Sequence, residues 1–259
     1  MKQKLRQLLK TIFKKFNIGI AGYSYFKLYL EYEKSIKYLN EIPDSKLIRL
    51  ASLIEKSKSQ LKQDLFVLAE LDFKKNGFFV EFGATNGIDL SNTYLLENEF
   101  GWDGILAEPA KFWHKDLNSN RNCNIETNCV WCDSVSVLNF NQVDEDAELS
   151  TISSFNTSDG RSKFRESGQN YKVNTISLND LLDKYNAPKK IDYLSIDTEG
   201  SEYEILSNFD FSKYEFRIIT CEHNGTPIRE KVFNLLTKNG YIRKYVGLSK
   251  WDDWYVKSE

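Results

Sequence analysis

Short apolar runs alternate with segments of helical periodicity from Gly77 to the end of the chain. Helices repeat apolar residues every three or four positions, whereas strands form short apolar runs, so this pattern predicts strands and helices in turn. Such alternation indicates βαβ units and a mostly parallel central sheet, and hence an α/β, Rossmann-like fold. The expected core strands are Phe78–Phe82, Gly104–Glu108, Ile125–Trp131, Ile191–Ile196 and Glu215–Cys221.

Two parts of the chain depart from this alternation. The segment Val143–Tyr171 is rich in Ser, Thr, Asp and Gly, and we expect it to form a loop or lid. It is followed by a short expected strand, Val173–Ile176, and by a helix that Ser177 would cap. Near the C-terminus, Tyr241–Val246 and Trp254–Lys257 are expected to form an antiparallel pair that closes the sheet.

The beginning of the chain reads as a helical extension. We place it at residues 1–70 and the main domain at residues 71–259. Residues 2–16 combine an apolar stripe with a basic face that has no acidic residue. Such a helix is suited to the surface of an anionic membrane, but it is equally suited to packing on its own domain or on a partner.

Composition narrows the classes of function. The chain has 259 residues and a net charge of −2, so it lacks the strong basic character typical of nucleic-acid-binding proteins. No run approaches the roughly 20 apolar residues that span a bilayer. We therefore expect a cytoplasmic protein with no nucleic-acid partner, in peripheral contact with the inner face of the membrane if residues 2–16 bind lipid.

Four cysteines are few for this length and predict a reducing compartment rather than a disulfide framework. Cys129 and Cys132 form a C-x-x-C pair, but they lie on an expected strand, where residues three apart point to opposite faces. We interpret them as structural residues rather than as a metal or redox site.

The run VEFGATNGIDLSNT, residues 80–93, joins the first strand to the next helix. Its E-x-G-x-x-x-G spacing differs from the G-x-G-x-x-G of dinucleotide enzymes, whose turn receives a pyrophosphate. An acid here would repel a pyrophosphate but suits the ammonium of a methionine moiety; a plain tight turn is the alternative interpretation. The candidate cofactor-binding residues of this run are Glu81, Gly83, Ala84, Asn86, Gly87 and Asn92.

Acidic residues also end later strands. Glu108 closes the run GILAE, where an acid is suited to hydrogen bonds with ribose hydroxyls, as in both nicotinamide and S-adenosylmethionine binders. Asp133 follows the third strand and is a candidate for the adenine amino group, although a turn-forming role explains it equally well.

The run IDYLSIDTEGSEYEIL, residues 191–206, places Asp197 and Glu199 after a buried strand, at the sheet edge where open α/β folds bind ligands. These carboxylates could hold a sulfonium cofactor, orient a hydroxyl or, with Glu222, ligate Mg²⁺. The simpler interpretation of such acids is capping of the following helix. We favour the version without a metal.

Together with ITCEHN at residues 219–224, these runs resemble the FkbM-type methyltransferases over roughly residues 59–245. The resemblance implies a class I methyltransferase fold and S-adenosylmethionine as methyl donor, with acceptor hydroxyls in sugars or polyketides. By this resemblance Glu81, Gly83 and Gly87 belong to the cofactor loop, Glu108 contacts the ribose, and Asp197 lies on the floor of the site.

A sugar hydroxyl benefits from a general base, and His223 is the leading candidate because it follows the fifth strand at the edge that carries Asp197. The expected catalytic residues are therefore His223, Asp197 and Glu199. We expect an O-methyltransferase that acts on a sugar of a surface polysaccharide, glycolipid or glycosylated metabolite. The alternatives are a nicotinamide-dependent oxidoreductase, which predicts the absent G-x-G-x-x-G, and a non-catalytic membrane-surface module.

Overall fold

The computed structural model describes residue 33 and residues 44–143 and 146–258. Its contacts group Ile42–Glu259 into one compact unit. Helices α3 (Asp44–Ala51) and α4 (Gln63–Glu70) belong to this unit. The boundary expected near residue 70 stays a prediction. The basic helix expected at residues 2–16 lies outside the described residues. None of the described helices is long and apolar enough to cross a membrane.

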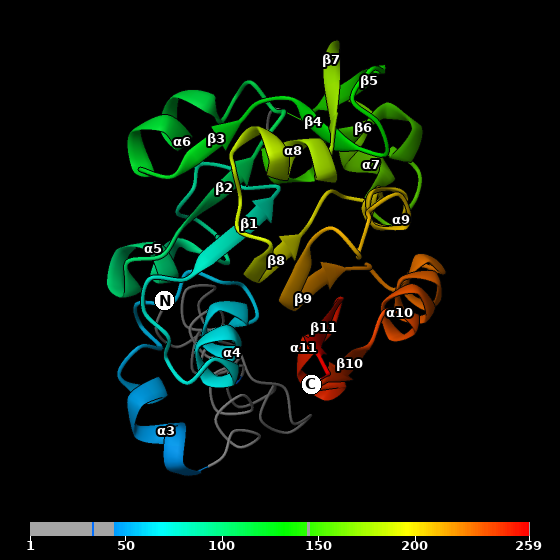
Figure 1. Ribbon diagram of the computed structural model, residues 1–259. Helices are drawn as coiled ribbons and strands as arrows, with labels where there is room; N and C mark the ends of the chain where they lie inside the picture. The colour runs from blue at the N-terminus through cyan, green and yellow to red at the C-terminus, as the bar shows by residue number, and fades with distance from the viewer. Residues whose placement is uncertain (1–32, 34–43, 144–145, 259) are drawn as a thin grey trace, which may run out of the picture. The chain divides into compact units, whose positions relative to one another are not determined.

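A seven-stranded sheet forms the centre of the compact unit (Figure 1). Its strand order is β10-β11-β9-β8-β1-β2-β3. The five strands from β9 to β3 are parallel, whereas β11 is antiparallel to both β9 and β10. This topology confirms the expected Rossmann-like sheet with a closing antiparallel pair. The strands are β1 (Phe78–Phe82), β2 (Asp103–Ala107), β3 (Asn124–Glu126), β8 (Lys190–Ile196), β9 (Glu215–Glu222), β10 (Tyr241–Lys244) and β11 (Asp252–Lys257).

A second sheet of four strands has the order β4-β7-β5-β6. It corrects two expectations. The single strand expected at Ile125–Trp131 is divided between β3 of the central sheet and β4 (Cys129–Trp131) of the second sheet. The segment expected to be a loop contributes β6 (Thr151–Ile152) and, together with its flanks, β5 (Val137–Gln142) and β7 (Gln169–Ser177), joined by η1 (Ala147–Leu149), η2 (Ser153–Phe155) and α7 (Ser162–Arg165).

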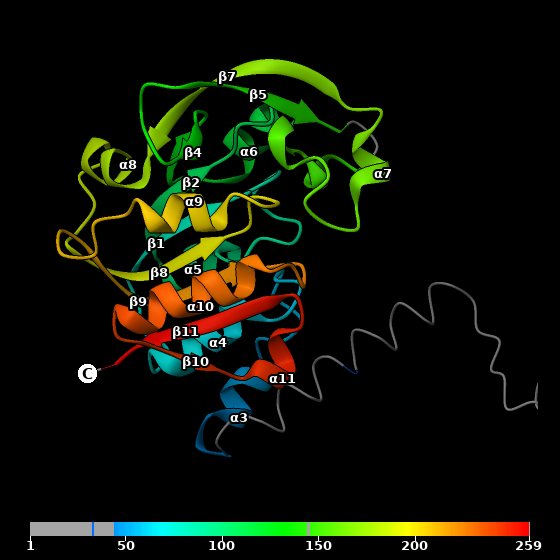
Figure 2. The same ribbon diagram turned by 90° about the vertical axis from the view of Figure 1, so that its right-hand side faces the viewer.

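Helices cover both faces of the central sheet, because alternate residues of each strand point to opposite sides. On one face, apolar residues of α8, α9 and α10 pack with Tyr255 in a common core. On the other face, Phe66 of α4 stacks on Trp254 with ring centroids 4.8 Å apart. Figure 2 shows α9 and α10 in front of the sheet and α4 behind it. The three helices on the first face are α8 (Leu178–Lys184), α9 (Glu202–Ser207) and α10 (Ile228–Lys238).

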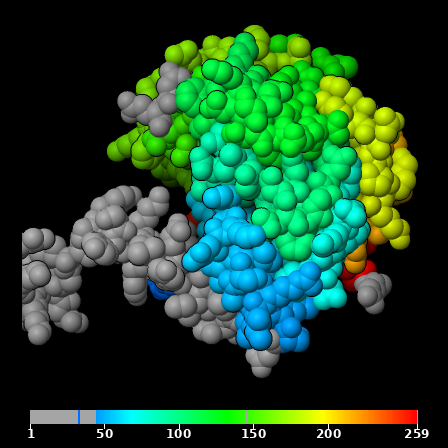
Figure 3. Space-filling view, turned by 90° about the vertical axis from the view of Figure 1, so that its left-hand side faces the viewer, coloured from blue at the N-terminus to red at the C-terminus, as the bar shows by residue number. Residues whose placement is uncertain are grey.

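Local sequence sets the helix boundaries. Ser177 caps α8 as expected, because its side-chain oxygen accepts a hydrogen bond from the backbone N–H of Asp180. The remaining helices are α5 (Tyr94–Phe100) and α6 (His114–Asn120), which lie between strands of the parallel half, and the short α11 (Val246–Ser249). Helix α3 lies on the surface, where Ile48 is 89% exposed (Figure 3).

Candidate functional site

A cavity of about 260 Å³ opens at the carboxyl edge of the central sheet. Its floor is formed by the ends of β1, β2, β8 and β9 and the beginning of β11. Residues 147–165, which we call the lid segment, contribute η1, β6 and Arg161 to its opposite wall. This edge is where open α/β sheets bind ligands.

Strand register aligns four carboxylates across the cavity floor. Asp252 of β11 is paired with Glu222 of β9. The last residues of β9 and β8, of β8 and β1, and of β1 and β2 are also in register, so these strands end side by side. The lining acids of these ends are Glu108, Asp197, Glu222 and Asp252, which we call the carboxylate row. The tip of β1 within this row is Gly83, which contributes no side chain.

Glu108 is held in place by the backbone. Its Oε2 accepts a hydrogen bond from Thr85 N at 2.9 Å, and its Oε1 accepts one from Ala110 N at 2.8 Å. Burial raises the pKa of Glu108 to about 7, although these two bonds lower it. Each carboxylate oxygen retains a second acceptor site, so Glu108 can still receive ligand hydroxyls.

Two further features of the cavity suit a bound ligand: a glycine at the tip of β1 and a buried side-chain oxygen without a hydrogen-bond donor among the described residues. Gly83 has a φ of 75°, and a Cβ there would lie 2.0 Å from the Asp197 carbonyl oxygen, so only glycine fits this strand tip. Asn92 lines the cavity and is 8% exposed. Its amide donates to Ser195 Oγ, while its Oδ1 has no hydrogen-bond partner among the described residues. A buried acceptor of this kind is costly unless a ligand donor reaches it.

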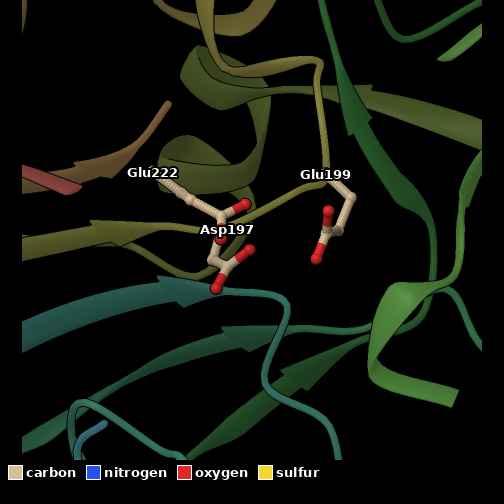
Figure 4. Close-up of side chains that lie close together, drawn as sticks. All are labelled: Asp197, Glu199 and Glu222. Atoms are coloured by element: carbon tan, nitrogen blue, oxygen red, sulfur yellow. The ribbon is translucent and has the colours of Figure 1, made fainter. Parts of the chain in front are cut away.

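Asp197, Glu199 and Glu222 converge, as Figure 4 shows, with one oxygen of each within 4.8 Å of the others. Burial raises the pKa of Glu222 well above its usual range, and the neighbouring charges of Asp197 and Glu199 raise it further. Burial, followed by the charge of Asp197, also raises the pKa of Glu199 to about 8. The site therefore holds more carboxyl groups than it can keep ionised at neutral pH.

Arginines of the lid segment reach the same carboxylates. Arg161 Nη1 lies 2.5 Å from Glu199 Oε1 and 3.6 Å from Glu222 Oε1. Arg165 donates to Glu199 Oε2 at 2.7 Å and to Asp159. The three acids expected as Mg²⁺ ligands do converge, but two guanidinium groups already bind Glu199. Ligation of Mg²⁺ stays a prediction.

Glu81 is placed outside the cavity lining. Its carboxylate accepts hydrogen bonds from Asn92 N at 2.7 Å and from the hydroxyls of Ser91 and Thr93, and Arg121 lies 3.9 Å away. Because Arg121 and the 91–93 turn use its oxygens, Glu81 fixes the loop after β1. The structure therefore does not support the expected contact between Glu81 and the cofactor.

Four other expected cofactor residues also lie outside the lining. Asn86 binds its own turn through Ile88 N and Asp89 N, and Gly87 packs against Arg121. Ala84 is buried beside Gly83. Asp133 accepts hydrogen bonds from Val135 N and Ser136 N, which supports the turn-forming interpretation. The expected residues that do line the cavity are Gly83, Asn92, Glu108, Asp197, Glu199 and Glu222.

His223 points away from the cavity. Successive strand residues face opposite sides, so the inward direction of Glu222 turns its neighbour outward. Both ring nitrogens of His223 meet the backbone: Nε2 lies 3.2 Å from Asp252 O, and Nδ1 accepts from Gly225 N at 2.9 Å. Burial lowers the pKa of His223. The structure therefore does not support His223 as the general base.

Sequence reasoning missed several polar lining residues, among them Asp252, Arg161 and Gln63. Asp252 precedes the expected start of the last strand, where an acid reads as part of a turn. Arg161 lies in the segment interpreted as a loop. Gln63 begins a helix that we had assigned to an extension. One usable signal was the Asp252-Asp253 pair before an alternating apolar run, because one of two adjacent acids on a strand must face inward.

All four cysteines are free, and Cys129 and Cys132 form no metal site with other described residues. Cys129 instead lines the cavity near Glu108, and burial raises the pKa of its thiol to about 12. A neutral, buried thiol acts as a small apolar side chain.

The cavity lining is rich in acidic residues. Six acids and one arginine line it, and no lysine does. The six acids are Glu108, Glu148, Asp197, Glu199, Glu222 and Asp252. A bound cation favours the ionised form of these carboxyl groups, whereas a phosphate disfavours it, so the lining favours positively charged ligands.

Comparisons with known proteins were made on the sequence and on the fold. The family model described as "Methyltransferase FkbM domain" matches residues 81–246, more than half of the chain. A search of the curated proteins finds no match. The chain is similar in fold to the precorrin-6y C5,15-methyltransferase of Geobacter metallireducens GS-15, with a TM-score of 0.39, 12% identity, and coverage of 74% of this chain and 85% of that chain.

A second similar structure is a candidate RNA methyltransferase of Pyrococcus horikoshii, with a TM-score of 0.38 and 9% identity. The alignment covers 77% of this chain and 83% of that chain. At these identities the two structures carry no information about substrate.

Proposed function

The chain belongs to the FkbM methyltransferase family, and from this premise we propose that it transfers a methyl group from S-adenosylmethionine to a hydroxyl group of a sugar. The observation that carries the choice of cofactor is the composition of the cavity lining, which has six acids and one arginine. S-adenosylmethionine has a sulfonium and an ammonium, whereas a nicotinamide cofactor has a pyrophosphate that these acids would repel.

The residues present fit this cofactor. Asn92 Oδ1 is an unpartnered acceptor for the ammonium, and Glu108 is suited to the ribose hydroxyls. Gly83 leaves the backbone open at the tip of β1, between Glu108 and Asp197. When bound, S-adenosylmethionine supplies an electrophilic methyl group on a positively charged sulfur.

The acceptor part of the proposal rests on the other end of the carboxylate row. There Asp252, Glu222 and Gln63 provide carboxyl and amide groups at the cavity wall. Such groups accept and donate several hydrogen bonds, which a polyhydroxylated ring can satisfy and an apolar acceptor cannot. This chemistry favours a sugar of a polysaccharide, glycolipid or glycosylated metabolite.

Isothermal titration of the full-length protein with S-adenosylmethionine and, separately, with NADH tests the cofactor. We expect binding of the first only. Glu108→Gln should weaken that binding by about 1–3 kcal/mol, because it removes a charged acceptor of hydrogen bonds. Glu230→Gln removes an equal charge at an exposed site of α10 and should leave the affinity unchanged. Binding of NADH, or no binding of either compound, would refute the proposal.

The acceptor is identified in cells. Deletion of the gene should remove a methylated sugar from the glycan, glycolipid or glycosylated-metabolite fraction, measured by mass spectrometry of hydrolysed extracts. Complementation with the wild-type gene should restore the product, whereas Glu108→Gln should restore it poorly. An unchanged set of methylated sugars in the deletion strain would exclude a sugar acceptor.

A further inference from the structure

The β11 end of the cavity contains a carboxyl group that the family resemblance does not assign. Asp252 is the first residue of β11 and is 5% exposed, and its side chain lines the cavity. The antiparallel register places it opposite Glu222, so both side chains lie on the same side of the sheet edge. Its neighbour Asp253 faces the other side, where it binds Arg229 and Arg243.

Asp252 is fixed from two directions. Gln63 Nε2 of α4 donates a hydrogen bond to Asp252 Oδ2 at 2.7 Å, and the Gln63 amide is itself oriented because its Oε1 accepts from Leu61 N at 2.9 Å. On the backbone side, His223 Nε2 lies 3.2 Å from Asp252 O, and His223 N donates to Trp251 O at 2.8 Å. A side chain held in this way is preorganised.

The geometry assigns the acceptor to the β11 end of the cavity, and we propose that Asp252 takes up the proton of the acceptor hydroxyl. This inference rests on the proposed function. His223 is then a positioning residue, because it holds the backbone of Asp252 and does not reach the cavity itself.

The other acids of the cavity are less suited to this role. Arg161 and Arg165 bind the oxygens of Glu199. Glu222 accepts a hydrogen bond from Asn224 and lies 3.6 Å from Arg161, so both of its oxygens are engaged. Asp197 lies beside Gly83, at the part of the carboxylate row that we assign to the cofactor. Glu108 accepts two backbone hydrogen bonds at the opposite end of the carboxylate row.

The surroundings of Asp252 suit a base that acts near neutral pH. Burial and, next, the charge of Asp197 raise its pKa to about 8, while the hydrogen bond from Gln63 lowers it. The charged groups that face it are Asp197 from β8 and Glu222 from β9, and α4 contributes the neutral Gln63. Asp253, on the other side of the strand, also raises the pKa through its charge. A general base is most effective when its pKa lies close to the working pH.

In the proposed step, the O–H bond of the acceptor breaks, and its proton moves to a carboxylate oxygen of Asp252. The freed electron pair on the acceptor oxygen forms the bond to the methyl carbon, and the carbon–sulfur bond breaks with its electron pair left on sulfur. The products are a methyl ether, a neutral thioether and a protonated Asp252.

The test compares full-length wild-type protein with Asp252→Asn, which keeps the shape of the side chain and removes its basicity. The acceptor probe is a mixture of the methyl α-glycosides of glucose, mannose and galactose, and methyl ethers are detected by mass spectrometry. We expect Asp252→Asn to lower kcat by roughly 10²–10⁴-fold, with the Kd for S-adenosylmethionine changed less than about twofold. Glu230→Gln, at an exposed site of α10, is the matched control and should retain kcat.

A second measurement does not depend on turnover. The carboxyl resonance of Asp252 is assigned in ¹³C-aspartate-labelled protein by its absence in Asp252→Asn, and then titrated. We expect its midpoint to move to higher pH in Gln63→Leu, because the hydrogen bond that stabilises the carboxylate is lost. A role confined to packing would leave this midpoint unchanged.

The outcomes separate the two proposals. A wild-type protein that binds no S-adenosylmethionine refutes the proposed function, and the inference falls with it. A wild-type protein that binds and methylates while Asp252→Asn turns over at an equal rate refutes the inference alone. An unmoved titration midpoint in Gln63→Leu also counts against it.

Discussion

Replacing a glycine can destabilise a protein through backbone strain at a positive φ angle and through steric clashes of the added Cβ. Gly83 and Gly225 allow these two effects to be measured separately. Both have positive φ angles, of 75° and 69°. A Cβ at Gly83 would lie 2.0 Å from Asp197 O, whereas a Cβ at Gly225 would meet nothing within 4 Å. We expect Gly225→Ala to cost about 1–2 kcal/mol of unfolding free energy from its backbone alone.

Gly83→Ala should cost roughly 1–3 kcal/mol more than that, because the tips of β1 and β8 must move apart. It should also weaken S-adenosylmethionine binding, because the same movement shifts Asp197. Denaturant unfolding and calorimetry of both variants check this. Equal losses of stability in the two variants would show that the close contact at Gly83 has no energetic consequence.

The raised pKa values of the cavity acids predict a pH-dependent affinity. The pKa is raised to about 7 for Glu108 and to about 8 for Glu199 and Asp252. A cationic ligand favours the ionised carboxylates and lowers these pKa values, so the complex binds fewer protons than the free protein. Affinity for S-adenosylmethionine should therefore rise from pH 6 to about pH 8 and level off above it.

Calorimetry at pH 7 in two buffers of different ionisation enthalpy measures the accompanying proton release. Glu108→Gln should release fewer protons than the wild type, because a titrating group assigned to the cofactor is gone. Affinity that is flat between pH 6 and pH 8 would mean that the acids do not respond to the bound charge.

At the scale of single residues, the sequence locates strand-end acids but does not give their direction. Glu108 and Asp197 follow apolar runs, and both line the cavity as expected. Glu222 and His223 are adjacent, and alternation lets only one of them face inward. Which one it is depends on the register of β9 against β8 and β11, and this register is set by contacts distant in the sequence.

At the scale of elements, the lid segment is attached to the floor by a buried arginine. Arg165 of α7 is 2% exposed and binds Glu199, Asp159 and Leu149 O. Arg165→Leu would leave Asp159 without its guanidinium partner and Glu199 with only one of its two, so we expect a loss of about 3–5 kcal/mol in unfolding free energy. Lys163→Leu, at an exposed position of the same helix, should change stability by no more than about 0.5 kcal/mol. Similar values for the two variants would contradict a structural role of the buried network.

Elements with a continuous apolar core were predicted well. The expected strand Phe78–Phe82 coincides with β1, and the β10–β11 pair is antiparallel as expected. The second sheet was missed because β7 has mainly polar, exposed residues along its first half, such as Asn170 and Lys172. A strand with one solvent-exposed face lacks the continuous apolar run that is typical of a fully buried strand.

The division of Ile125–Trp131 had a similar cause. Two short strands separated by only two residues show much the same apolar pattern as one longer strand. The turn between them is fixed by Glu126, whose Oε1 accepts from Asn128 N and whose Oε2 binds Lys184 of α8. The partner from α8 is more than 50 residues away in the sequence, so no local pattern reveals the turn.

At the scale of the whole molecule, the basic segment at residues 2–16 keeps its two interpretations. If it binds membranes, full-length protein should co-sediment with vesicles that contain anionic lipid and not with neutral vesicles. Replacing Lys4, Lys10 and Lys14 by Glu should abolish that binding. The same protein should bind S-adenosylmethionine normally, because the lining residues among those that the structure describes begin at Gln60. If the protein co-sediments equally with anionic and neutral vesicles, or with neither, the remaining interpretation is that residues 2–16 pack on the protein itself or on a partner.

The excess of acids over basic residues in the cavity also affects how the site empties. A cationic donor enters surroundings that attract it, and transfer of its methyl group leaves an uncharged sulfur behind. Under the proposed function, each turnover thus discharges the ligand by one unit while the walls stay acidic, so the spent donor is held less firmly than the fresh one. The reaction would then favour release of its own by-product, without a separate device to expel it.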